Sequence, residues 1–139
     1  MPGHITKVAD MRRHVEALIA LYLRKDLDYG IQVYWLPRTD GALVIRDLDH
    51  TVLEIRLPRI RSIISYAIAL HEIGHVRGRY QHSRHVMTRE RWAWQWAREN
   101  ALIWSPTMER TAAKSLFGAQ ADQAWRALRQ RSSRPNARC

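Results

Sequence analysis

Hydrophobic side chains recur at helical spacing near the start of the chain, over residues 10–24. The apolar positions are Met11, Val15, Leu18, Ile19 and Tyr22. Residues three and four positions apart share one face of a helix, so this pattern predicts an amphipathic helix with Asp10 as its N-cap. Residues 1–9 are expected to form a loose lead-in. His14 falls on the polar face of the helix, where we expect a solvated histidine.

The period then changes to the alternation that is typical of strands. Residues 31–35 alternate until Pro37, residues 43–46 follow a turn at 39–42, and residues 52–57 alternate until Pro58. Three short strands with tight connections predict a small antiparallel meander with the helices on one side of it. The third strand has two interpretations: an exposed edge that could pair with an extended substrate segment, or an ordinary internal strand.

The next helical stretch covers residues 63–77 and is apolar around much of its circumference, which predicts a central, buried helix. Ser62 is its expected N-cap and Gly78 its expected end. Ionisable residues inside such a helix need a chemical reason, because an unpaired charge is costly to bury.

Two more helices are predicted after the central one. The first covers residues 88–104 and carries three tryptophans, which we expect mainly in core packing: Trp92, Trp94 and Trp96. The second covers residues 108–130 and has a possible break near Gly118. Its inward-facing residues are expected to be Ala112, Leu116, Ala124 and Leu128. Residues 131–139 are rich in Arg, Ser and Pro and are expected to form a disordered basic tail.

These elements together predict a single α+β domain over residues 1–130. It would contain an N-terminal helix, a small three-stranded antiparallel sheet, a central helix that carries the active site, and two C-terminal helices. The active site is placed on the central helix because that helix contains the pentapeptide HEIGH, residues 71–75.

The pentapeptide places two histidines, His71 and His75, four positions apart. Such residues project from the same face of a helix, one turn apart, so that their imidazoles can bind one ion together. HExxH is the pattern of zinc hydrolases, in which the glutamate, here Glu72, lies beside the ion and deprotonates a water molecule. The alternative is a pair of core histidines satisfied by hydrogen bonds, and the apolar flanks of the helix favour the metal site over it.

A catalytic zinc ion takes three protein ligands and a water molecule, so a third ligand is expected downstream. The candidates are His82, His85, Glu90 and Glu99. The extended pattern HExxHxxGxxH would place a histidine at position 81, but that residue is Gln81. His82 comes one residue too late for this pattern, and His85 lies further from the expected position. Glu90 shares its helix face with alanines, which let another helix approach closely, whereas Glu99 shares its face with tryptophans. The spacing therefore favours Glu90.

HEIGH on a buried helix, followed on the next helix by E-x-x-A at residues 90–93 and W-A at residues 96–97, resembles the ImmA/IrrE family of small metallopeptidases. The resemblance covers roughly residues 50–106. Members of this family have a zincin-type core and are best known for cleaving phage or stress-response repressors. The resemblance therefore implies a zincin-like core and a protein or peptide substrate, with a DNA-binding repressor as one candidate.

The resemblance also implies a role for each matching residue. Zinc (Zn2+) would be bound by His71, His75 and Glu90, and Glu72 would be the general base. In the resulting mechanism, zinc lowers the pKa of its bound water, and Glu72 accepts the proton and then delivers it to the leaving amine. A further donor to the oxyanion is expected among Tyr80, His82 and His85, and no spacing rule selects one of them.

The charge of the chain suggests an alternative function. The net charge is +10 and the pI is about 10.8. This charge suggests either an anionic partner, nucleic acid being the commonest, or a proteome that favours arginine at surface positions. No helix-turn-helix, zinc-finger or RNA-binding pattern accompanies the charge, so direct nucleic-acid binding is the less favoured function. A non-catalytic zinc-binding protein is the other alternative.

The remaining composition narrows the class of protein. The only cysteine is Cys139, so neither a disulfide framework nor a cysteine-based zinc site is expected. The N-terminal residues lack the basic and apolar regions of a signal peptide, and no apolar stretch is long enough to span a bilayer. We therefore expect a cytoplasmic protein that has no membrane partner.

Overall fold

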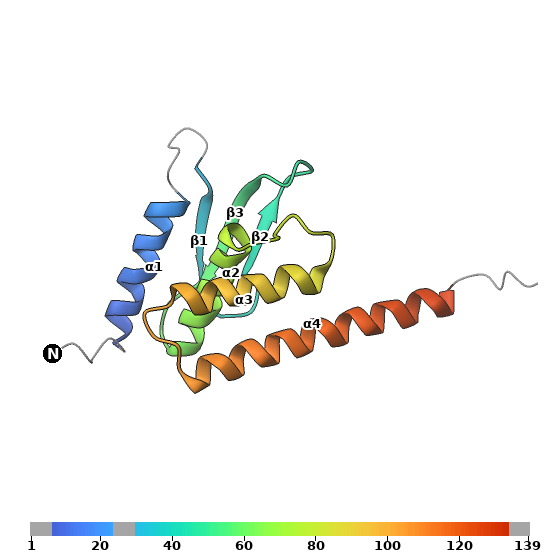
Figure 1. Cartoon of the computed structure of the whole chain (residues 1–139). Helices are drawn as coiled ribbons and strands as arrows, with labels where there is room; N and C mark the ends of the chain where they lie inside the picture. The colour runs from blue at the N-terminus through green and yellow to red at the C-terminus, as the bar shows by residue number, and fades with distance from the viewer. Residues whose placement is uncertain (1–6, 24–29, 134–139) are drawn as a thin grey trace, which may run out of the picture.

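The computed structural model describes residues 7–23 and 30–133 of the chain (Figure 1). In chain order the elements are α1 (Val8–Tyr22), β1 (Gln32–Leu36), β2 (Leu43–Arg46), β3 (Val52–Pro58), α2 (Ile63–Arg77), α3 (Val86–Asn100) and α4 (Pro106–Ser133). The described chain has an α+β fold, as predicted. α2 packs against β3 and β2, α1 and α3 pack on α2, and α4 lies against α2 and α3.

The sheet is mixed, so the predicted antiparallel meander is wrong. The strand order is β1-β3-β2, with β1 parallel and β2 antiparallel to β3. Residues 37–42 connect two strands that are not neighbours, and this connection is longer than a two-residue hairpin turn. β3 occupies the centre because it is the most buried of the three strands, with Ile55 and Leu57 fully covered. β1 and β2 are therefore both edge strands.

α2 begins and ends where the sequence predicts, at Ile63 and Arg77. The hydroxyl oxygen of Ser62 accepts a hydrogen bond from the backbone N–H of Ser65, and the Ser65 hydroxyl oxygen accepts one from the backbone N–H of Ser62. This reciprocal pair is a capping box, which satisfies two N–H groups at the start of the helix. The helix is buried over most of its length, so the predicted central helix is confirmed.

α1 begins slightly before the predicted start, with Lys7 rather than Asp10 at the N-cap, so the lead-in is shorter than expected. Residues 1–6 lie outside the described residues. The expectation that His14 is solvated is wrong, because its ring is half-buried and contacts Tyr66 of α2. The Tyr66 hydroxyl accepts from the backbone N–H of Leu102 (3.0 Å) and donates to Nδ1 of His14 (2.7 Å). Burial lowers the pKa of His14, in keeping with a neutral imidazole that accepts this bond.

The last two helices differ from their predicted bounds. α3 begins before residue 88 and ends at Asn100, and an irregular segment then leads into α4. α4 begins at Pro106, whose ring is compatible with the first turn of a helix. It continues to Ser133 without the predicted break at Gly118. Residues 131–133 of the expected disordered tail are therefore helical, and residues 134–139 lie outside the described residues.

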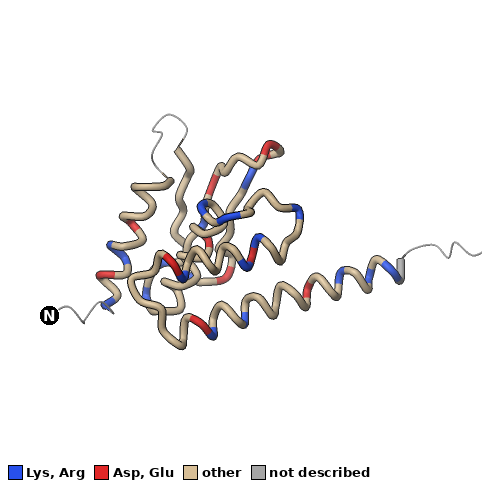
Figure 2. The backbone as a smooth tube through the Cα atoms, in the orientation of Figure 1, with Lys and Arg blue, Asp and Glu red and all other residues tan. Residues whose placement is uncertain are grey.

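The second half of α4 extends beyond the body of the molecule (Figure 1). Ala112 is buried and Leu116 packs against the core, as predicted, but Ala124 and Leu128 are exposed because this part of α4 runs past the other helices. Basic residues predominate along this half of the helix (Figure 2). None of the described helices, α4 included, combines the length and hydrophobicity needed to cross a membrane.

Candidate metal centre

His71 and His75 of α2 lie one helical turn apart and face the first half of α3. Their ring centroids are 4.5 Å apart, with the planes inclined at 67°. His71 is buried and His75 is half-buried. The predicted pair of imidazoles on one helix face is therefore present.

Glu90 of α3 completes this group. Its carboxylate oxygens lie 2.8 Å from Nε2 of His71 and 3.2 Å from Nε2 of His75. One possible ligand atom from each of the three residues lies within 4.8 Å of the others, and such a group could hold a metal ion. The structure thus brings together the three residues that the sequence analysis selected as metal ligands.

The other candidate ligands lie outside the group. Glu99 accepts a hydrogen bond from Gln95 Nε2 (3.1 Å) on another face of α3. His82 and His85 are exposed residues of the loop between α2 and α3. Glu90 is the only one of the four candidates that forms part of the described cluster.

Small residues allow α3 to approach α2 closely enough for Glu90 to reach the histidines. Ala93 and Ala97 are fully buried between the two helices. A side chain at Gly74 would collide with the backbone carbonyl oxygen of Ala93, because the two backbones touch at this point. The predicted alanine face is therefore confirmed, and Gly74 is the matching small residue on α2.

Gln81 positions His75, and the sequence analysis missed this role. Its Nε2 donates to the backbone carbonyls of Arg79 (3.1 Å) and Arg89 (2.9 Å), so its Oε1 faces His75 Nδ1 at 2.9 Å and accepts from it. Because Gln81 accepts from Nδ1, that nitrogen keeps its proton, and Nε2, which faces Glu90, is the nitrogen left to bind a metal. The extended zinc pattern expects a histidine at position 81. The sequence therefore contained a signal that the residue at this position lies beside the site.

Trp94 and Glu72 hold the ring of His71. The indole of Trp94 is buried and stacks on the His71 ring with the centroids 4.2 Å apart and the planes at 11°. Glu72 Oε1 lies 3.3 Å from Nδ1 of the same ring. The expected packing role is confirmed for Trp94, which is buried in the core, and for Trp96, which is half-buried and packs against the core. Trp92 is also half-buried.

The charges of this cluster shift two pKa values in opposite directions. Burial alone would lower the pKa of His71, but the hydrogen bonds and negative charges of Glu72 and Glu90 raise it to about 9. Burial alone would raise the pKa of Glu90, but its hydrogen bonds to His71 and His75 and their charges hold it well below its usual range. In the absence of an ion, the protein therefore holds a protonated His71 beside an ionised Glu90 at neutral pH.

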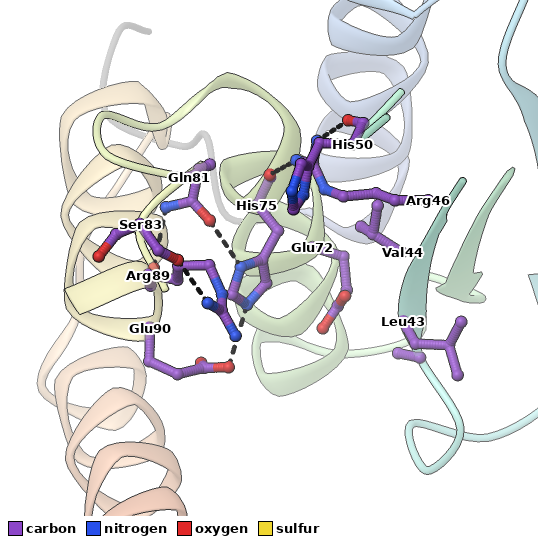
Figure 3. Close-up of a pocket in the computed structure, with 11 residues that line it drawn as sticks. Leu43, Val44, Arg46, His50, Glu72, His75, Gln81, Ser83, Arg89 and Glu90 are labelled. Atoms are coloured by element: carbon purple, nitrogen blue, oxygen red, sulfur yellow. Dashed lines mark hydrogen bonds and ion pairs between the residues drawn. The ribbon is translucent and has the colours of Figure 1, made fainter. Parts of the chain in front are cut away.

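A cleft of about 440 Å³ opens beside the cluster, between α2 and α3 on one side and β2 on the other (Figure 3). Its lining residues are Ala42, Leu43, Val44, Arg46, His50, Glu72, His75, Gln81, Ser83, Arg89 and Glu90. Glu72 lies between His75 and the wall formed by β2 (Figure 3). The predicted oxyanion donors Tyr80, His82 and His85 do not line this cleft.

The residues present suit a zinc ion. Two imidazole nitrogens and one carboxylate are a donor set found in catalytic zinc sites, which leave a further position open. His75 also has the partner on its second ring nitrogen that metal-binding histidines usually have, here supplied by Gln81. The same donors bind other first-row divalent metals, so the geometry supports a metal site without identifying the metal.

Comparison of the chain with protein-family models, with curated proteins and with solved structures finds no match. The candidate metal site therefore rests on the HExxH spacing and on the convergence of His71, His75 and Glu90.

Metal affinity is expected to rise with pH, by about tenfold per pH unit between about pH 6 and about pH 8. A pKa of about 9 keeps His71 protonated over this range, so a metal ion that binds must displace about one proton. Calorimetry in two buffers of different ionisation enthalpy would count that proton. His85→Gln is the control, since His85 is exposed and outside the cluster. An affinity that does not change over this range would contradict the prediction.

Proposed function

We propose that the protein is a zinc-dependent metallopeptidase with a zincin-like core, similar to the ImmA/IrrE proteins. One observation carries the proposal: His71, His75 and Glu90 converge within 4.8 Å at the wall of an open cleft, and Glu72 of the same HExxH motif lines that cleft. A structural metal site is usually closed by four protein ligands, whereas this group has three and faces a cavity.

Zinc would be held by Nε2 of His71, Nε2 of His75 and the carboxylate of Glu90. When bound, it would lower the pKa of a water molecule toward neutrality and polarise the substrate carbonyl. Gln81 keeps His75 in the tautomer that ligates through Nε2. Trp94 covers one face of His71 and holds its ring toward Glu90.

Glu72 is the proposed general base. Its carboxylate would accept a proton from the attacking water and donate it to the nitrogen of the leaving amine. Glu72 is 6% exposed, so its charge is largely shielded from solvent, and it is open to the cleft where a substrate would lie. It is not part of the three-residue ligand group, which leaves it available for proton transfer.

The position of β2 supports a peptide as the substrate. Of the two interpretations of the third strand, the structure supports the internal strand, because β3 is central. β2 is an edge strand instead, and Ala42, Leu43, Val44 and Arg46 line the cleft. An extended peptide could add to this edge through backbone hydrogen bonds and place a carbonyl beside the metal group. A repressor protein is one possible source of such a segment.

Removal of the metal tests the proposed function. The purified protein is expected to bind about one zinc ion per chain and to cleave an unfolded protein or a mixed peptide library, because its site would supply a bound ion and a base. A chelator should stop cleavage and added zinc should restore it, as followed by mass spectrometry of the products.

Two results would favour the alternative functions. Stoichiometric zinc without cleavage of any peptide would favour a non-catalytic zinc-binding protein. An affinity for DNA that falls with salt and does not change with the chelator would favour a nucleic-acid-associated protein.

A further inference from the structure

Two arginines reach the same cleft from opposite walls. Arg46 comes from the end of β2 and Arg89 from the first half of α3, on the two sides of His75 (Figure 3). Arg89 directly precedes the candidate ligand Glu90. Neither arginine belongs to the metal group, so their presence in the cleft needs a separate explanation.

Arg46 is fixed in place by the backbone. Its guanidinium donates Nη1 to the carbonyl of His50 at 2.7 Å and donates Nη2 to the carbonyl of His75 at the C-terminal end of α2. Burial and, to a smaller extent, the positive charge of Arg89 lower the pKa of Arg46. Both guanidinium groups line the same cleft, where like charges repel each other.

Arg89 has donors left to bind a ligand. Its Nη1 donates to the carbonyl of Ser83, which holds the guanidinium at the cleft wall. Among residues 7–23 and 30–133, no protein group accepts a hydrogen bond from its Nε or Nη2. No carboxylate of those residues forms an ion pair with Arg46 or Arg89, and the two carboxylates of the cleft, Glu72 and Glu90, pair with histidines instead.

Two arginines of one cleft, neither with a carboxylate partner among the described residues, leave an excess of positive charge there. A divalent ion in the metal group would add to that charge, because its own ligands contribute only the carboxylate of Glu90. A planar guanidinium with a free edge binds a carboxylate through two parallel hydrogen bonds, and Arg is the side chain best suited to this geometry. The cleft therefore has the chemistry of a site for an anion.

We propose that Arg89, which lies across the cleft from Arg46, binds the side-chain carboxylate of an acidic residue close to the scissile bond of a peptide substrate. The proposal rests on the proposed peptidase function and deepens it, since it assigns a substrate preference to the same cleft. Arg89 is the direct contact because it has free donors, and Arg46 adds positive charge from the β2 wall. The acidic residue would lie on the part of the peptide that runs between β2 and the start of α3.

A peptide library in which each position carries Asp or its neutral counterpart Asn tests this preference. The zinc-loaded protein is expected to cleave the Asp peptides about tenfold faster or more at one position next to the cleaved bond, because a charge-assisted hydrogen bond is formed only there. Arg89→Gln should remove the preference. Arg91→Gln is the matched control, since it removes the same charge from an exposed position of the same helix outside this cleft and should retain the preference.

A binding measurement separates failure of this inference from failure of the proposed function. N-acetyl-aspartate amide and N-acetyl-asparagine amide are titrated into the zinc-loaded native protein and into zinc-loaded Arg89→Gln, and calorimetry gives both affinities. In the native protein the side-chain Nε–Hε resonance of Arg89 is also followed by NMR. Tighter binding of the aspartate compound, lost in Arg89→Gln, supports the inference even if no peptide is cleaved. Equal affinity of the native protein for both compounds, or a preference that persists in Arg89→Gln, would overturn it and would point to the metal ion alone as the anion site.

Discussion

Glu72→Gln is expected to reduce kcat/KM for peptide cleavage by about a thousandfold or more while the zinc content stays at the native level. Glutamine has nearly the same shape as glutamate, so its side chain fits the same buried position and retains a hydrogen-bonding oxygen near His71. It has no carboxylate to accept the proton of the attacking water. Because Glu72 is not one of the three clustered ligand residues, the metal should remain bound. Zinc analysis and peptide kinetics on the same sample measure both effects.

Glu16→Gln provides the control for Glu72→Gln. Glu16 is an exposed glutamate of α1, and its replacement changes the net charge equally without touching the cleft. Native activity in Glu72→Gln would refute the general-base role. Loss of zinc together with activity would instead place Glu72 among the groups that hold the metal.

Glu90→Ala is expected to weaken zinc binding by at least about a hundredfold, because it removes one of three ligands and leaves only the two histidines of α2. The same substitution at Glu99 should leave zinc binding unchanged, because Glu99 lies on another face of α3 and bonds to Gln95. Competition with a chromophoric chelator measures the affinity of both variants. The pair is well matched, since each removes a glutamate from the same helix.

Glu90→Ala is also expected to lower the stability of the metal-free protein. Without zinc, Glu90 pairs with both histidines, so its loss leaves a buried His71 with fewer partners. The thermal midpoint of both variants should therefore be recorded without metal, to show that Glu90→Ala is folded when its affinity is measured. Retained zinc in folded Glu90→Ala, or loss of zinc in Glu99→Ala alone, would refute the assignment of the third ligand.

The convergence of His71, His75 and Glu90 could be predicted from the sequence because each of the two helices places its residues through a local pattern. His71 and His75 are held on one face by the geometry of a single helix, and Ser62 and Gly78 mark where that helix begins and ends. Glu90 could be chosen over Glu99 because the two occupy different faces of the next helix, and only the face with Glu90 carries small residues. Each inference depends on positions a few residues apart, where helical periodicity is reliable.

The order of the strands could not be predicted in the same way. Alternation identified all three strands, but it does not say which strands pair, and the short connection at residues 37–42 suggested a hairpin where the chain instead leaves room for β3. The same limit applies to Gln81, whose three hydrogen bonds reach the carbonyl of Arg79 in the preceding loop, the carbonyl of Arg89 in α3 and the ring of His75. The exposure of Leu128 likewise follows from where α4 leaves the body of the protein, not from its own spacing.

The contact between α2 and α3 at Gly74 has a consequence for the dimensions of the metal site. The separation of the two helices there is limited by main-chain atoms of Ala93, which cannot change rotamer or repack as side chains do. The distance between the histidines and Glu90 therefore depends on how closely the main chains of α2 and α3 can approach each other. A single methyl group at position 74 would push the helices apart, so a substitution that keeps His71, His75 and Glu90 in the sequence would still move Glu90 away from the histidines.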